Sequence, residues 1–403
     1  MSMTRRNFLQ TAALFSAAGL APRFLTQSVA AEETIAGFKD DRILVVVQLG
    51  GGNDGLNTVV PYNNDTYYRL RPALGLRDRL LTINDELALN PSLTPLMRLY
   101  DDAKVSIIEG VGYPNPDRSH FRSMEIWHTA TGSDEFEGRG WLGRYFDNTC
   151  SGSARPHAGV AIGNERPQAF EGERGFGIAT DNPARFGWIA GNGPDNEAAF
   201  NQLNREATSD SHTLDFLRHT TTNAVLSSKE VQQAAERGKV GPVAHGRTFN
   251  QLDVVAGLIR GGLQTRIYYV STSGFDTHAN QLGQQDRLLG QFAEAVARFQ
   301  DQLEKDGAAD RVLTLVFSEF GRRVHENASG GTDHGTAAPM FLVGRNVKAG
   351  IHGSPPDLDN LDEGDLRHTV DFRSVYASVL EQWLAADAQK ILLQKFDTLP
   401  LIV

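Results

Sequence analysis

The sequence predicts an α/β fold: a doubly wound, mostly parallel sheet with helices on both faces. Residues 43–49 (ILVVVQL) form an almost continuous apolar run, typical of a strand that is covered on both sides of a parallel sheet. Strand-like and helix-like segments then alternate along much of the chain. Such alternation favours β-α-β units, in which each strand is followed by a helix that packs on the sheet.

The elements after this first strand are predicted from local pattern. Pro91 suits the first turn of a helix, and the final helix is indicated by apolar residues at helical spacing. The segment from about residue 145 to 250 is richer in glycine, proline and polar helix formers, which predicts a cap or insertion. The remaining predictions are a helix at 90–100, a strand at 105–109, a helix at 254–262, a strand at 266–270, a helix at 284–303, a strand at 312–317 and a helix containing Phe372, Val375, Val379 and Trp383.

The first thirty residues predict an export signal rather than part of the fold. Residues 4–10 (TRRNFLQ) have a twin-arginine pattern, followed by a short apolar stretch and the small-residue sequence Ser28-Val29-Ala30. The apolar stretch is too short for a stable membrane span. We therefore expect the twin-arginine translocase to export the chain to the periplasm or the cell exterior, leaving a single domain of residues 31–403.

Composition limits the function classes. The formal net charge of −10 makes nucleic acid an unsuitable partner. Cys150 is the single cysteine, so the chain has neither an internal disulfide nor a cysteine-rich metal site. The glycines at residues 50–55 do not present the Gly-x-Gly-x-x-Gly pattern of dinucleotide-binding proteins.

Polar residues follow the predicted strands at the points where the strands end. Because open α/β sheets bind ligands outside the carboxyl ends of their strands, these positions are candidates for a site. Mixed carboxylate and imidazole ligands suit zinc or manganese, and also calcium if oxygen dominates. The predicted ligands of a divalent metal ion are Asp54, Asp276, His278, Glu319 and His334.

Ser119 stands at the predicted start of a helix, between Arg118 and His120. One interpretation is that Ser119 caps the helix. The other is that Ser119 is a nucleophile, because a helix N-terminus favours a transferred anion. In that case Arg118 would hold the anion and His120 would hold it or shuttle a proton.

These phrases resemble the bacterial domain-of-unknown-function family 1501, whose members carry twin-arginine signals. The resemblance extends over nearly the whole mature chain. It rests on six phrases in order: residues 51–57 (GGNDGLN), 118–121 (RSHF), 140–144 (GWLGR), 274–278 (GFDTH), 318–322 (SEFGR) and 332–335 (TDHG).

The family in turn resembles the alkaline phosphatase and sulfatase superfamily. That resemblance implies a metal ligand at Asp54, a nucleophile at Ser119, ligands at Asp276 and His278, and a last ligand at His334. It also implies an alkaline phosphatase-like fold and a small-molecule ester as substrate.

The chain departs from the superfamily at two points. Its aspartate and histidine at 276 and 278 are separated by one residue instead of about three, and Glu319-Phe320 replaces an Asp-His pair. A single metal, a rearranged metal pair or a lost activity all remain compatible with these changes. Two functions follow as hypotheses: an exported metal-dependent hydrolase of phosphate or sulfate esters, and a non-catalytic exported binding or assembly protein that retains the fold.

Overall fold

The computed structural model describes residues 38, 40–150, 156–173, 177–187, 227–243 and 249–403. The predicted export signal, residues 1–30, lies outside the described residues. In the described part of the chain, no helix has the length and apolar character needed to cross a membrane.

A nine-stranded sheet forms the centre of the described structure, with the order β11-β5-β10-β9-β1-β8-β6-β7 and with β12 paired to β5. β1 runs parallel to both of its neighbours, β8 and β9. The predicted α/β fold with a mostly parallel sheet is therefore confirmed. The strands are β1 (Ile43–Leu49), β5 (Val105–Gly112), β6 (Gly159–Ile162), β7 (Ile178–Thr180), β8 (Ile267–Thr272), β9 (Val312–Phe317), β10 (Ala338–Val343), β11 (Gly350–His352) and β12 (Val370–Asp371).

The predicted strand at residues 43–49 coincides with β1, whose seven residues are all buried. Val45 and Val47 belong to one apolar cluster, whereas Leu44 and Val46 belong to another. Successive side chains of a strand point to opposite faces of a sheet. The apolar run therefore supplies both cores at once.

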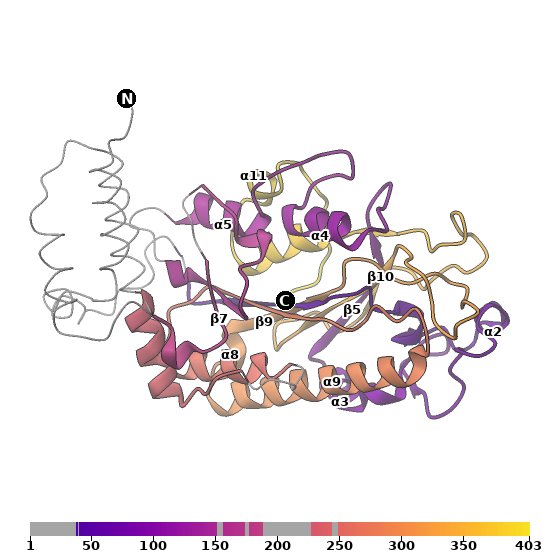
Figure 1. The fold of residues 1–403 in the computed structure, drawn as a ribbon, viewed down its shortest axis with the longest axis horizontal. Helices are drawn as coiled ribbons and strands as arrows, with labels where there is room; N and C mark the ends of the chain where they lie inside the picture. The colour runs from indigo at the N-terminus through magenta and orange to yellow at the C-terminus, as the bar shows by residue number, and fades with distance from the viewer. Residues whose placement is uncertain (1–37, 39, 151–155, 174–176, 188–226, 244–248) are drawn as a thin grey trace, which may run out of the picture.

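Helices cover both faces of the sheet. Figure 1 shows α3, α8 and α9 on one side and α4, α5 and α11 on the other. The helices are α2 (Asp65–Leu70), α3 (Thr94–Asp101), α4 (His120–Thr129), α5 (Trp141–Thr149), α8 (Gln251–Arg260), α9 (Gln281–Lys305), α10 (Phe372–Ser378), which continues as a π-helical turn (Val379–Trp383), and α11 (Ala388–Leu392). Short 3-10 turns occur at Gly55–Asn57, Pro91–Leu93, Pro156–Ala158, Gln168–Phe170, Pro183–Arg185 and Ala309–Arg311.

Two features of the fold were not predicted, one in the central sheet and one outside it. β10 runs antiparallel between β9 and β5, and its buried sequence APMFLV is as apolar as a parallel strand. Outside this sheet, a small three-stranded sheet packs β2 (Val59–Val60), β4 (Ala88–Leu89) and β3 (Leu81–Thr82) in that order.

The segment predicted as a cap or insertion, about residues 145–250, is only partly described. Its described part contributes β6 and β7 to the edge of the central sheet, where β6 pairs in parallel with β8. Residues 227–238 are helical. At least this part of the segment thus belongs to the main fold.

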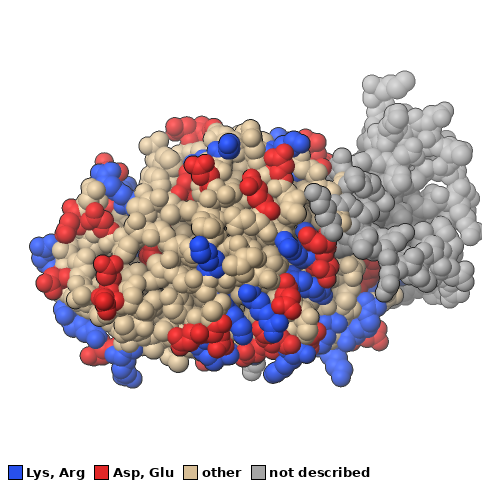
Figure 2. Space-filling model, turned by 180° about the vertical axis from the view of Figure 1, so that it is seen from behind, with Lys and Arg blue, Asp and Glu red and all other residues tan. Residues whose placement is uncertain are grey.

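Charged side chains of both signs are interspersed over the face shown in Figure 2. A mixed surface of this kind is ordinary for a globular protein.

Candidate metal centre

Most of the predicted site residues lie at one edge of the sheet. Asp276 follows β8, Glu319 follows β9, and His334 lies in the loop that leads to β10. His120 is the first residue of α4, in the connection that follows β5. β1, β8 and β9 are parallel, so their carboxyl ends bring loops distant in sequence to the same place.

Three of these residues form a group that could hold a metal ion. The ligand atoms of His120, Asp276 and His334 all lie within 4.8 Å of one another. Oδ1 of Asp276 lies 3.0 Å from Nε2 of His334 and 3.5 Å from Nε2 of His120. Nε2 of His278 is a further neighbour, 3.0 Å from the same Asp276 oxygen and 3.0 Å from Nε2 of His334.

Each imidazole has an acceptor behind it, at the ring nitrogen that points away from the group. Nδ1 of His120 lies 2.9 Å from Oε1 of Glu319, and Nδ1 of His278 lies 3.2 Å from Oδ1 of Asp333. Nδ1 of His334 donates to the backbone carbonyl of Arg118 at 2.8 Å. These contacts hold Nδ1 of each ring and direct Nε2 toward Asp276, which is the usual orientation of metal-binding histidines once Nε2 is deprotonated.

The pKa values of Asp276 and His120 are shifted by their neighbours in opposite directions. Burial by itself would raise the pKa of Asp276, but hydrogen bonds from Arg322 and His334 outweigh that effect and lower the pKa to about 2. The hydrogen bond to Glu319 raises the pKa of His120, although partial burial opposes the rise. Asp276 is therefore ionised at neutral pH and available to a cation.

Glu319 lies behind His120 instead of within the group of ligand atoms. Its side chain is 1% exposed, and Oε1 also accepts a hydrogen bond of 2.8 Å from the backbone N–H of Gly51. The hydroxyl of Ser318 donates to Oε2 at 3.2 Å. The carboxylate predicted as a ligand thus orients His120, a role that strand position alone does not reveal.

Asp54 is not brought into the group. Its side chain is fully buried, and Oδ2 accepts hydrogen bonds from Arg71, at 2.7 Å, and from Gln281. Oδ1 is buried without a hydrogen-bond partner among the described residues. The glycine-rich loop after β1 therefore directs this carboxylate into the protein, where it forms an ion pair with Arg71.

Arg322 is a structural member of the site that the sequence did not single out, although it ends one of the quoted phrases. Its guanidinium is fully buried and donates 2.7 Å hydrogen bonds to Oδ1 of Asp276 and to the carbonyl of Gly52. It also donates to the carbonyls of Thr332 and Phe275. Arg322 thus ties together the loops that follow β1, β8 and β9.

Gly51 allows two of these loops to approach closely. Its φ is +115°, and a Cβ at this position would lie 2.5 Å from the backbone nitrogen of Asp276. Any other residue would therefore push the Asp276 loop away.

Ser119 occupies the N-cap position of α4, but its side chain makes no capping hydrogen bond. Its backbone N–H instead donates to Oδ1 of Asp117 at 2.7 Å, and the residue is exposed. The capping interpretation is therefore wrong. Nε of Arg118 donates to Asp365 at 2.8 Å, so the guanidinium predicted to hold an anion is already paired with a carboxylate.

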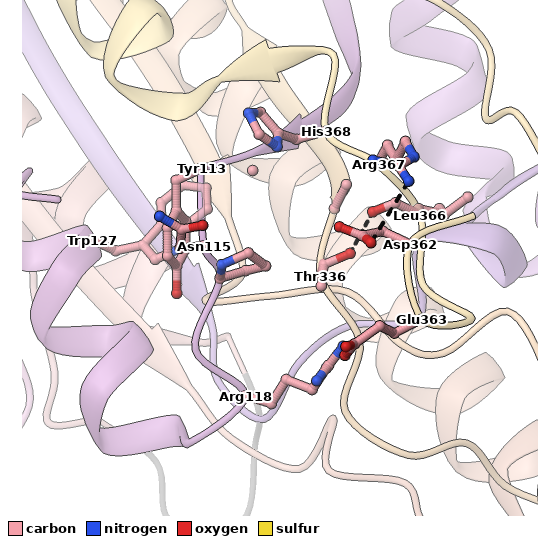
Figure 3. A pocket seen from close by; sticks show the side chains of 13 residues that line it. Tyr113, Asn115, Arg118, Trp127, Thr336, Asp362, Glu363, Leu366, Arg367 and His368 are labelled. Atoms are coloured by element: carbon pink, nitrogen blue, oxygen red, sulfur yellow. Dashed lines mark hydrogen bonds and ion pairs between the residues drawn. The ribbon is translucent and has the colours of Figure 1, made fainter. Parts of the chain in front are cut away.

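A cavity of about 490 Å³ includes Arg118, two residues before His120, in its wall. Figure 3 shows Tyr113, Asn115 and Trp127 on one side of this cavity and Asp362 and Arg367 on the other. Its wall also includes Thr336, two residues after His334. The cavity is thus lined by aromatic and charged side chains, and its wall does not include His120, Asp276 or His334.

The profile of a family described as "Protein of unknown function (DUF1501)" matches residues 41–394 of the chain. No curated protein matches the chain at a significant level.

Several solved structures are similar to the chain at low identity. A protein in the alkaline phosphatase superfamily from Vibrio parahaemolyticus has 9% identity and a TM-score of 0.39, covering 97% of this chain and 78% of its own. The C-terminal periplasmic domain of EcEptC from Escherichia coli has 9% identity and a TM-score of 0.39, covering 92% and 94%. The sulfatase PsFucS1 from Pseudoalteromonas sp. has 9% identity and a TM-score of 0.36, covering 97% and 74%. TM-scores of this size do not establish a shared activity.

Proposed function

This chain belongs to the DUF1501 family, and we propose that it is an exported, metal-dependent hydrolase of phosphate or sulfate esters. The observation that carries the proposal is the convergence of imidazole Nε2 atoms on Oδ1 of Asp276, with the opposite nitrogen of each ring held by an acceptor. Rings held in this way are already oriented for a metal ion.

The donor set fits a divalent metal. Nε2 of His120 is buried and has no hydrogen-bond partner among the described residues. A buried acceptor without a partner is costly, and a metal ion would remove that cost. Imidazole nitrogens outnumber carboxylate oxygens in the group, so zinc or manganese fits better than calcium.

His120, Asp276 and His334 would hold the ion, and the nearby His278 could complete its coordination. When bound, a divalent metal supplies Lewis acidity and makes a nucleophile available at neutral pH. Glu319 and Asp333 would keep His120 and His278 in the orientation that binding requires. The ionised Asp276 would neutralise part of the charge of the ion.

Ser119 is the proposed nucleophile. It is exposed next to His120, and its hydroxyl is not used as a helix cap. The first backbone N–H groups of an α-helix have no partner within the helix, so those at the start of α4 would favour a transferred anion. Attack by Ser119 would form a covalent phosphoryl or sulfuryl ester, with release of the alcohol, and water would then hydrolyse that ester.

A non-catalytic binding or assembly protein is the second candidate. It is favoured by Glu319, which lies behind His120. In the alkaline phosphatase and sulfatase superfamily, which the family resembles, an Asp-His pair of metal ligands occupies the corresponding sequence position. Within the described ranges, only one group of three metal-ligating residues occurs. One ion could then be retained without the paired-metal chemistry of a hydrolase.

The test combines metal analysis with an ester panel. Purified mature protein should contain close to one divalent ion per chain, and the His120→Ala and His334→Ala variants should lose it. The exposed His325 provides a matched control, because His325→Ala should retain the metal. Hydrolysis of p-nitrophenyl phosphate, bis-p-nitrophenyl phosphate or p-nitrophenyl sulfate by the loaded protein alone would support the hydrolase. Metal binding without turnover of any ester would support the second candidate, and absence of metal would refute the proposed centre.

A further inference from the structure

Glu109 is a buried carboxyl group on a strand that lies next to the edge strand β11 of the central sheet. It lies on β5, is 3% exposed, and its Oε1 atom has no hydrogen-bond partner among the described residues. Burial raises the pKa of Glu109 to about 8. An unpaired carboxyl in this environment destabilises the folded protein, so its presence needs a physical reason.

The backbone is also irregular at Glu109. Ile108 pairs with Met340 and Val111 pairs with Ala338, so Glu109 and Gly110 lie opposite the single residue Pro339. This is a β-bulge, and Gly110 adopts a φ of +66° within it. Bulges interrupt the hydrogen-bond ladder and re-aim side chains, often beside binding sites. At Glu109 the strand pairing is therefore irregular, and a buried carboxyl oxygen also lacks a hydrogen-bond partner among the described residues.

Glu109 lines a cavity of about 230 Å³ that is separate from the group of metal-ligand atoms. Much of the cavity wall is apolar and includes Leu56, Val59, Pro339 and Pro355. A volume of this size holds a small organic molecule. The apolar wall would cover its carbon atoms, and Glu109 would face a polar group.

Other charged or titratable residues of the wall do not neutralise Glu109. Arg367 is directed to Asp362, with the two charged groups 3.6 Å apart. Burial lowers the pKa of His368, which leaves this ring neutral. Oδ1 of Asp357 accepts backbone N–H groups of its own turn. The carboxyl of Glu109 is therefore left to a ligand.

At neutral pH the carboxyl is mostly protonated while it has no partner, and a cationic hydrogen-bond donor in the cavity would stabilise its ionised form instead. Glu109 does not belong to a group of three metal-ligating residues in the described part of the chain, which disfavours a divalent metal. An ammonium group has three N–H donors, and a single carboxylate is a sufficient anchor for it. We propose that this cavity binds a small primary alkylammonium ion through Glu109, independently of the metal centre.

Thermal unfolding and calorimetry of the full mature chain test the proposal, with n-butylammonium chloride as the probe. We expect a saturable rise of Tm with n-butylammonium and no rise with equal concentrations of 1-butanol or sodium butyrate, because only the first supplies the cationic donor. The effect should persist in EDTA, since the metal centre is not involved.

Glu109→Gln keeps the shape of the side chain and removes its charge. We expect affinity for n-butylammonium to fall roughly tenfold or more, while the variant unfolds at no lower temperature than the wild type without the probe. Glu109→Leu provides a second variant if the amide disturbs folding. The exposed Glu86 is the control, and Glu86→Gln should bind as the wild type does. A wild type that shows no saturable response, or Glu109 variants that respond equally, would overturn the proposal.

Discussion

Replacing Glu319 by glutamine is the sharpest test of how the metal centre is organised. The substitution keeps the size of the side chain but removes the charge that faces Nδ1 of His120 at 2.9 Å. The amide can still accept a hydrogen bond from Gly51, so the loop after β1 should stay in place. The perturbation is therefore confined to the orientation and basicity of one predicted metal ligand.

The size of the effect follows from burial. Glu319 is 1% exposed, so solvent cannot replace the lost carboxylate. Removing the partner of a metal-binding histidine typically weakens metal affinity about 10- to 100-fold, or about 1.4–2.7 kcal/mol. Asp333 holds His278 in the same way but is 59% exposed, and water can take over its role. Asp333→Asn should therefore cost less than Glu319→Gln.

Competition with a chromophoric chelator measures both affinities on folded protein. We expect the order wild type, Asp333→Asn, Glu319→Gln from tightest to weakest. Unchanged zinc affinity in Glu319→Gln would refute the role assigned to Glu319. A larger loss in Asp333→Asn would refute the argument from burial.

The same variant has a pH signature in the metal-free protein. The hydrogen bond to Glu319 raises the pKa of His120 in the folded state above the ordinary value. A raised pKa gives stability that is fully present below the unfolded pKa of about 6.5 and is lost as pH rises through the folded pKa. Glu319→Gln should lower the His120 pKa measured by NMR titration and weaken this pH dependence. An unchanged titration would contradict the assignment of the contact.

Three further predictions concern other parts of the chain. Ser119→Ala should cost less than about 0.5 kcal/mol of unfolding free energy, because no cap bond is lost, while ester turnover falls by orders of magnitude; substantial turnover in the folded variant would exclude Ser119 as nucleophile. Asp54→Ala should lower the free energy of unfolding by about 3–5 kcal/mol, because it leaves the buried charge of Arg71 without its carboxylate. Elemental analysis of the folded fraction should still find the metal, and loss of the metal would show that Asp54 is a ligand. Replacing Arg5 and Arg6 by lysine should retain the precursor in the cytoplasm in a fractionation assay, and normal export would show that the signal is misread.

Much of the fold could be predicted because its signals are local. The strands at 43–49 and 312–317 were predicted with their observed ends, since each is an apolar run with a polar or glycine-containing loop after it. The α9 helix was predicted at 284–303 from apolar residues at helical spacing and extends from Gln281 to Lys305. The antiparallel β10 was missed because a strand buried on both faces carries no sequence mark of its direction.

The sequence by itself determined which edge of the sheet carries the candidate site and placed Asp276, His278 and His334 in its loops. Only the tertiary structure decided the position of each side chain relative to the others. It placed His120 with the ligand atoms, Glu319 behind that ring, and Asp54 in a buried ion pair. The physical reason is distance along the chain. The position of a strand depends on residues that are neighbours in sequence. The contact between a ligand and its supporting partner instead joins loops whose residues are about 50 to 270 positions apart.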